Sequence, residues 1–181
     1  ISSNKLIYAD SVDGLMPSIE VILTQQTHKK LDAVFVIDAT ESMKDDVHKL
    51  RELLLTSLKK VLPKYESYRL GLVLYKDYYD DFLTKTACDF TSDLNRFSAA
   101  LHSFSVFGGR DIPEAVYEGL DAGLDLEWRP DKDTDRKIIL IGDAPPHARP
   151  QGSITKESVI EAAKKQDVKL HPIILPHNRT Y

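Results

Sequence analysis

The sequence predicts an α/β protein with a doubly wound, mostly parallel central sheet, helices on both faces and one antiparallel edge strand. Two observations lead to this fold class. Short apolar runs rich in β-branched residues alternate with stretches whose apolar residues recur at the period of a helix. The connections between these segments are short, and such alternation is typical of a parallel sheet covered by helices.

The first core strand is expected at 31–39, where the run "LDAVFVIDA" is almost continuously apolar. A run of this kind suits a strand that is buried on both faces of a parallel sheet. From Met43 to Val61 the apolar residues follow the 3.6-residue period of an amphipathic helix, and Pro63 is expected to end it.

Two further apolar runs, 68–78 and 84–90, are separated by a polar turn and predict a hairpin at the edge of the sheet. The remaining segments continue the alternation: a helix capped by Ser92, a helix with Pro113 near its start, a strand at 137–142, a helix at 154–166 and a strand at 168–175. Each predicted strand therefore has a helix or a hairpin partner next to it in the chain.

Composition excludes several classes of protein. The chain has 181 residues, and 42% of them are apolar, which is enough for one folded domain and too much for a disordered one. The net charge of −4 and the scattered lysines and arginines argue against nucleic acid as a partner. No apolar run approaches the roughly 20 residues that span a bilayer, so we expect no membrane insertion by this segment. The single cysteine, Cys88, excludes an internal disulfide.

The stretch "DATES" places Asp38, Thr40 and Ser42 at alternate positions directly after the first strand. Alternation lets the three side chains point the same way from an extended segment. Their oxygens are hard donors, which suit Mg²⁺, Mn²⁺ or Ca²⁺ better than zinc or copper. Because two of the donors are neutral hydroxyls, a bound cation would remain electrophilic and would accept water or a carboxylate from a partner.

Two more segments are expected near this point. Asp143 follows the strand at 137–142, and the glycine-containing loop "GGRDIPE" at 108–114 leads into a helix. In an open α/β sheet the ligand lies outside the carboxyl ends of the strands, where the strand order reverses. We therefore expect the three segments to converge on one site.

Together, "DATES", "GGRDIPEA" and "IGDAPPH" resemble the von Willebrand factor type A domain, over residues 31–175, and the last of them is similar to bacterial members. The resemblance implies a metal-ion-dependent adhesion site whose first motif is Asp38, Thr40 and Ser42. It also implies a domain at 31–181, preceded by an N-terminal extension at 1–30. Family members commonly carry a final helix after the last strand, and this chain ends where that helix would begin.

The second element of the family's site is usually a threonine, which the loop at 108–114 lacks. The loop is similar to the integrin β-subunit form, in which an acidic residue replaces the threonine, so the resemblance implies Asp111 or Glu114 as a ligand, with Asp111 favoured. Asp143 matches the third element, which in this family usually reaches the metal through water. An added acidic ligand would tighten cation binding and weaken the attraction for a partner's carboxylate.

Each segment also has a purely structural interpretation. Residues 38–42 suit a helix N-terminus, Asp111 suits an N-cap ahead of Pro113, and Asp143 suits a turn before prolines. The metal site is favoured because all three segments occur together at strand or loop ends.

Other polar segments are weighed in the same way. Tyr78, Tyr79 and Arg110 are expected to line the partner-binding face, although the tyrosines also suit the polar end of a hairpin. The acidic stretch at 129–137 lacks the glycine and terminal glutamate of an EF-hand and is expected to be a solvated loop. His147 lies near the proposed metal but matches no hard-cation ligand set, His171 is expected to be structural, and Met43 and Trp128 are expected to be packing residues.

The leading hypothesis is a non-catalytic adhesion module that binds Mg²⁺ (or Mn²⁺ or Ca²⁺) and docks a protein ligand through its Asp or Glu. The alternative is a magnesium-dependent phosphoester hydrolase or phosphotransferase that uses Asp38. The phosphotransferase pattern Asp-x-Asp-x-Thr needs a second carboxylate at residue 40, which is a threonine here. A third possibility is a metal site that only holds the loops. The start at isoleucine suggests a mature form or an excised segment of a longer protein. The bacterial resemblance favours an extracytoplasmic or surface location over the cytoplasm.

Overall fold

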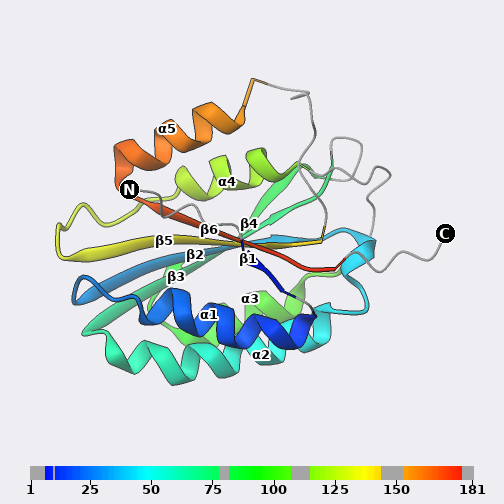
Figure 1. Cartoon of the computed structure of the whole chain (residues 1–181), viewed down its shortest axis with the longest axis horizontal. Helices are drawn as coiled ribbons and strands as arrows, with labels where there is room; N and C mark the ends of the chain where they lie inside the picture. The colour runs from blue at the N-terminus through cyan, green and yellow to red at the C-terminus, as the bar shows by residue number, and fades with distance from the viewer. Residues whose placement is uncertain (1–6, 10, 78–81, 107–114, 144–152, 177–181) are drawn as a thin grey trace.

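The computed structural model describes residues 7–9, 11–77, 82–106, 115–143 and 153–176. These residues form a six-stranded sheet, in the order β1-β6-β5-β2-β3-β4, between two layers of helices (Figure 1). The strands are β1 (Ile7–Tyr8), β2 (Lys30–Asp38), β3 (Ser67–Tyr75), β4 (Thr84–Thr91), β5 (Thr134–Gly142) and β6 (Lys169–Ile174). The α-helices are α1 (Leu15–Thr24), α2 (Val47–Val61), α3 (Leu94–Ser103), α4 (Val116–Leu124) and α5 (Lys156–Gln166). The predicted fold class is confirmed, because every pairing is parallel except that of β3 with β4 at the edge.

The central strand β2 pairs in parallel with β3 on one side and with β5 on the other. Eight of its nine residues are buried, as predicted from the apolar run. Phe35 and its alternate neighbours face α1, α2 and α3, and the Phe35 ring lies 5.7 Å from that of Phe97. Val34 and Val36 face α4 and α5 on the opposite side of the sheet (Figure 1).

The helix predicted from Met43 begins later, at Val47. Residues Glu41–Met43 form a 3₁₀ turn instead, and the Met43 side chain is fully buried, as expected of a packing residue. The helix ends at Val61, and Pro63 lies in the next 3₁₀ turn, consistent with the predicted stop. None of the described helices is long and apolar enough to cross a membrane.

The predicted edge hairpin is confirmed by the antiparallel pairing of β3 with β4. The prediction that Ser92 caps the next helix is wrong. The N-cap of α3 is Asp93, whose Oδ1 accepts a hydrogen bond of 2.9 Å from the backbone N–H of Asn95. Asp93 directly precedes the first helical residue, so its carboxylate can reach the free N–H groups of the first turn. Pro113 lies outside the described residues.

The segment predicted to be an N-terminal extension contributes to the same core as the rest of the described chain. Strand β1 pairs in parallel with β6, and α1 packs on α2 with its apolar side chains buried. The Lys137 ammonium of β5 donates hydrogen bonds to the carbonyl oxygens of Ile22 (2.5 Å) and Gln25 (2.9 Å) at the end of α1. Packing of the described residues is thus continuous across residue 31.

The stretch 129–137, expected to be a solvated loop, is a strand from Thr134 onward, and this part of the prediction is wrong. Asp135 and Lys137 in that strand are both buried. The stretch shows no apolar alternation in the sequence. It can still form a strand because its polar side chains find partners inside the protein. Arg129, at the start of the stretch, is one of those partners.

The buried carboxylate of Asp32, in β2, is bound by two arginines. Arg69 donates to it through Nε (3.0 Å) and Nη2 (2.6 Å), and Arg129 donates through Nε and its backbone N–H, both at 2.8 Å. Burial raises the pKa of Asp32, but the hydrogen bonds and charges of the arginines lower it overall. Arg69 also stacks 4.4 Å from the centre of the Phe90 ring, which packs edge-on against Trp128. Trp128 is therefore a packing residue, as expected.

Replacing Asp32 by asparagine should destabilise the protein by about 3–5 kcal/mol, because it leaves two arginines without their buried counter-charge. Urea denaturation of the wild type and Asp32→Asn measures this difference. The matched control is Asp131→Asn, which removes an exposed ion pair with Lys30 and should leave the midpoint nearly unchanged.

The difference in stability between the wild type and Asp32→Asn should depend on pH. Because the pKa of Asp32 is lowered in the folded state, its contribution is fully present above about pH 4 and is lost as the pH falls through the folded-state pKa. The stabilities of wild type and Asp32→Asn should therefore converge only below about pH 4. Convergence at neutral pH would contradict the charge-pairing role.

Candidate functional site

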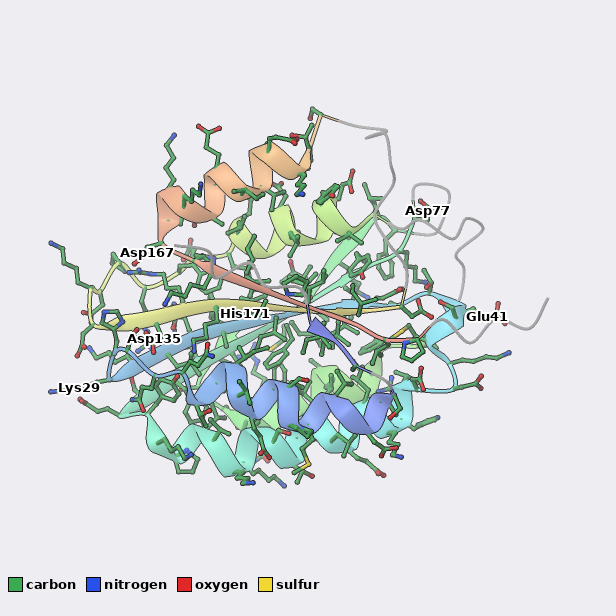
Figure 2. All side chains as sticks on the ribbon, in the orientation of Figure 1. Lys29, Glu41, Asp77, Asp135, Asp167 and His171 are labelled. Carbon is green, nitrogen blue, oxygen red and sulfur yellow. The ribbon has the colours of Figure 1, made fainter. Side chains whose placement is uncertain are left out.

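Two neighbouring parallel strands end at the same edge of the sheet, and each is followed or closed by an aspartate. Strand β2 ends at Asp38, and β5 ends at Gly142, directly before Asp143. The register pairs Ile37 with Ile141, so the two carboxylates come from adjacent positions. Figure 2 labels Glu41 and Asp77 at this end of the molecule, beside the same strand ends. The structure thus brings together two of the three segments that were expected to converge.

The side chains of Asp38, Thr40, Ser42 and Asp143 form one hydrogen-bonded chain. The backbone N–H and the hydroxyl of Thr40 both donate to Asp38 Oδ1, at 2.9 and 2.6 Å. The hydroxyl oxygens of Thr40 and Ser42 lie 3.2 Å apart, and Ser42 donates to Asp143 Oδ1 at 2.9 Å. The alternate spacing brings the oxygens of Asp38, Thr40 and Ser42 together, and the fold adds Asp143 from the end of β5.

The electrostatics of this cluster are unusual for a protein interior. Asp38 and Thr40 are fully buried, and Asp143 is buried as well. Burial raises the pKa of Asp38 to about 7, the negative charge of Asp143 adds to the shift, and the hydrogen bond from Thr40 opposes it. Asp38 Oδ2 is buried with no hydrogen-bond partner among the described residues. An unsatisfied oxygen next to a second carboxylate and two hydroxyls is a donor set that fits a hard divalent cation.

Close packing around the backbone of Gly142 supports the cluster. A Cβ atom at Gly142 would lie 3.4 Å from the Cβ of Asp38 and would collide with the Tyr75 hydroxyl, so only glycine fits there. The Tyr75 ring in turn lies against Gly119 of α4. Tyr75 is fully buried, so it is a packing residue. A glycine directly before the strand-end aspartate was the sequence signal for this contact, and sequence reasoning missed it.

Asp46 is a second residue that sequence reasoning missed. It is the N-cap of α2, and its pKa is raised by burial and by the charges of Asp143 and Asp45. This influence from Asp143 places Asp46 at the border of the cluster. The signal was the acidic pair before the helix, four residues after Ser42.

Several predicted residues lie outside the described part of the chain: Tyr78, Tyr79, Arg110, Asp111, Glu114 and His147. The choice between Asp111 and Glu114 therefore stays open. In the described part, no group of three or more His, Cys, Asp or Glu side chains is placed to hold a metal. There the cluster consists of two carboxylates and two hydroxyls.

Known proteins that resemble this chain include one curated relative and two solved structures. The relative is the "Alpha-protein kinase vwkA" of Dictyostelium discoideum, which is 29% identical over 124 residues, or 65% of this chain. The chain spans only 19% of that protein's length. The conserved hypothetical protein BatB of Bacteroides thetaiotaomicron superposes with a TM-score of 0.55 at 18% identity, covering 80% of this chain and 66% of BatB.

The type V pili tip protein Mfa5 of Porphyromonas gingivalis, represented by its three N-terminal domains, superposes with a TM-score of 0.50 at 24% identity. That match covers 64% of this chain and 20% of the Mfa5 chain. At these identities the two structures show a shared fold. The family model of the von Willebrand factor A domain matches residues 32–180, which is most of the sequence. The chain therefore belongs to the von Willebrand factor A domain family.

Proposed function

We propose that this domain is a non-catalytic protein-binding module that holds Mg²⁺ or Mn²⁺ at its carboxyl-end cluster. A protein partner would dock on that cation through an aspartate or glutamate. Von Willebrand factor A domains are protein-interaction modules, and membership of the family supports the general class. The cation and the acidic ligand are the specific content of the proposal.

The observation that carries the proposal is a contrast between two buried aspartates of β2. Asp32, at the amino end, is neutralised by two arginines, and its pKa is lowered. Asp38, at the carboxyl end, meets a backbone N–H, a hydroxyl and a second carboxylate, and its pKa is raised. Burying one carboxylate next to a second carboxylate is costly. A divalent cation between them would supply the charge that the arginines supply to Asp32.

The chemistry of the donors limits which ions suit the cluster and what a bound ion can do. Asp38, Thr40, Ser42 and Asp143 offer only hard oxygens, which suit Mg²⁺ or Mn²⁺ and which also accept Ca²⁺. When bound, the ion supplies an electrophilic centre for a carboxylate. The two carboxylates, Asp38 and Asp143, together match the charge of a divalent cation, and the two hydroxyls add no charge. Asp111 or Glu114 would add an anionic ligand, tightening the ion and weakening the pull on a partner.

An enzymatic function remains the rival hypothesis. The name of the Dictyostelium relative includes the word kinase, but this chain spans only 19% of that protein. The kinase name therefore describes the whole relative. A phosphotransfer mechanism through Asp38 needs an acid–base carboxylate two residues later, where Thr40 stands. A screen of phosphoesters with Mg²⁺ separates the two hypotheses. Turnover that disappears in Asp38→Asn would favour the enzyme.

Metal-stripped protein should bind Mg²⁺ and Mn²⁺ in isothermal titration, and Asp38→Ala and Asp38→Asn should abolish the binding. The reason is the loss of the buried anionic donor at the centre of the cluster. Asp125→Asn, which removes an exposed carboxylate at the end of α4, is the matched control and should bind like the wild type. The metal-loaded wild type should then prefer a glutamate-containing peptide to its glutamine counterpart.

Two results would end this proposal: no divalent cation bound by the wild type, or unchanged binding in Asp38→Ala. If the protein binds the metal but shows no preference between the peptides, the cation site stands and the docking role is wrong. The cluster would then serve only to hold its loops together.

Thr40 offers a sharper test, because its hydroxyl can be removed without changing the shape of the side chain. Thr40→Ser keeps the oxygen and should change the affinity for Mg²⁺ by no more than about twofold, whereas Thr40→Val should weaken it by about tenfold or more. Titration of both variants, with thermal melting to verify folding, makes the comparison. Equal affinities of the two variants would show that the hydroxyl is not a ligand.

A further inference from the structure

A second polar site lies at the opposite end of the sheet from the carboxyl-end cluster. It is a surface pocket of about 250 Å³ at the amino ends of β5 and β6. Figure 2 labels Asp135 and Asp167, two of its lining residues, at the end of the molecule opposite Glu41 and Asp77. Nothing in the proposed cation site involves this pocket.

Two lysines line the pocket side by side. The register pairs Lys137 of β5 with Lys169 of β6, so the two side chains leave the same face of the sheet. Lys137 is only 2% exposed, and two of the three protons of its ammonium are used by the carbonyl oxygens at the end of α1. Lys169 is exposed, and its ammonium has no hydrogen bond or ion pair with any described residue. Both ammonium groups therefore retain donors that no described residue uses.

The acidic groups of the pocket are engaged by donors other than these lysines. The Asp135 carboxylate accepts from the backbone N–H groups of Thr27 (3.0 Å) and His28 (3.3 Å), from the Thr27 hydroxyl and from the His28 ring nitrogen Nδ1 (2.7 Å). Its four donors leave it little capacity for another cation. The Asp167 carboxylate is 82% exposed and lies 3.9 Å from Arg136, which is a third cation of the pocket.

The charge environment of Lys137 also favours an anion. Burial lowers the pKa of Lys137 to about 8, and the positive charge of Lys169 adds to the shift, although Asp135 opposes it. Two ammonium groups that leave the same face of the sheet from paired positions form an arrangement that a bound oxyanion would stabilise.

We propose that this pocket binds a small oxyanion, held by the ammonium groups of Lys137 and Lys169. A phosphate group and a carboxylate share the required chemistry, and the volume suits a small molecule that carries either group. The site is independent of the divalent cation, because its donors are positively charged and lie at the other end of the sheet.

The test is a titration of inorganic phosphate, and separately of acetate, into metal-stripped wild-type protein, in a buffer of constant ionic strength without other oxyanions. Removing the metal excludes an anion that binds to a cation at the carboxyl-end cluster. We expect saturable binding of at least one of the two probes. The tighter probe identifies the headgroup as phosphate or carboxylate.

Lys169→Gln is the decisive variant, because the side chain is exposed and its loss should not disturb folding. It should weaken the binding by about tenfold. Lys165→Gln removes the same charge from an exposed position of α5 that does not line the pocket, and it should bind like the wild type. Lys169→Gln should leave titrations with Mg²⁺ unchanged, because Lys169 lies at the other end of the sheet from the carboxyl-end cluster.

The proposal is overturned if the wild type binds neither probe, or if Lys169→Gln and Lys165→Gln bind equally well. Equal weakening in both variants would indicate general attraction to surface charge, which also overturns it. None of these results depends on whether the carboxyl-end cluster binds Mg²⁺, so failure of one proposal leaves the other standing.

Discussion

The carboxylate of Asp32 and the two arginines that bind it hold the amino end of the sheet together. The three side chains come from β2, from β3 and from the segment before β5, so one buried charge joins parts of the chain up to 97 residues apart. Arg129 also donates to the Leu31 carbonyl of β2 and to the Ser67 hydroxyl of β3, and these bonds connect it to the start of both strands. The register of β2 against β3 and β5 follows from these contacts and from the apolar faces. In that register, β2 and β5 end next to each other at Asp38 and Gly142.

The position of the strand ends decides the chemistry at the other edge of the sheet. Asp32 and Asp38 lie on the same strand and face, six residues apart, yet their surroundings differ in charge. One carboxylate is balanced by cations of the protein itself. The other lies beside Asp143 and accepts hydrogen bonds from Thr40, and its pKa is raised instead of lowered. The two ends of β2 thus place a buried carboxylate in opposite electrostatic surroundings.

Part of this arrangement was readable from local patterns. The run at 31–39 identified the buried central strand, and the spacing of Asp38, Thr40 and Ser42 identified a cluster of oxygens. The start of α2 was misplaced because a 3₁₀ turn separates the motif from the helix, and both conformations have similar apolar spacing. The contribution of β1 was missed because two residues carry no detectable period. The polar start of β5 was missed because its side chains find partners inside the protein.

By itself, the sequence determined the buried strands, the alternation of strand and helix, and the kind of oxygen donor available at the end of β2. These properties depend on neighbouring residues, since the periods of strands and helices and the direction of alternate side chains are local. Only the tertiary structure decided which charges meet: Asp38 with Asp143, Asp32 with two arginines, and Lys137 with Lys169. The compensation of a buried charge depends on segments far apart in the chain, and their proximity is created by folding.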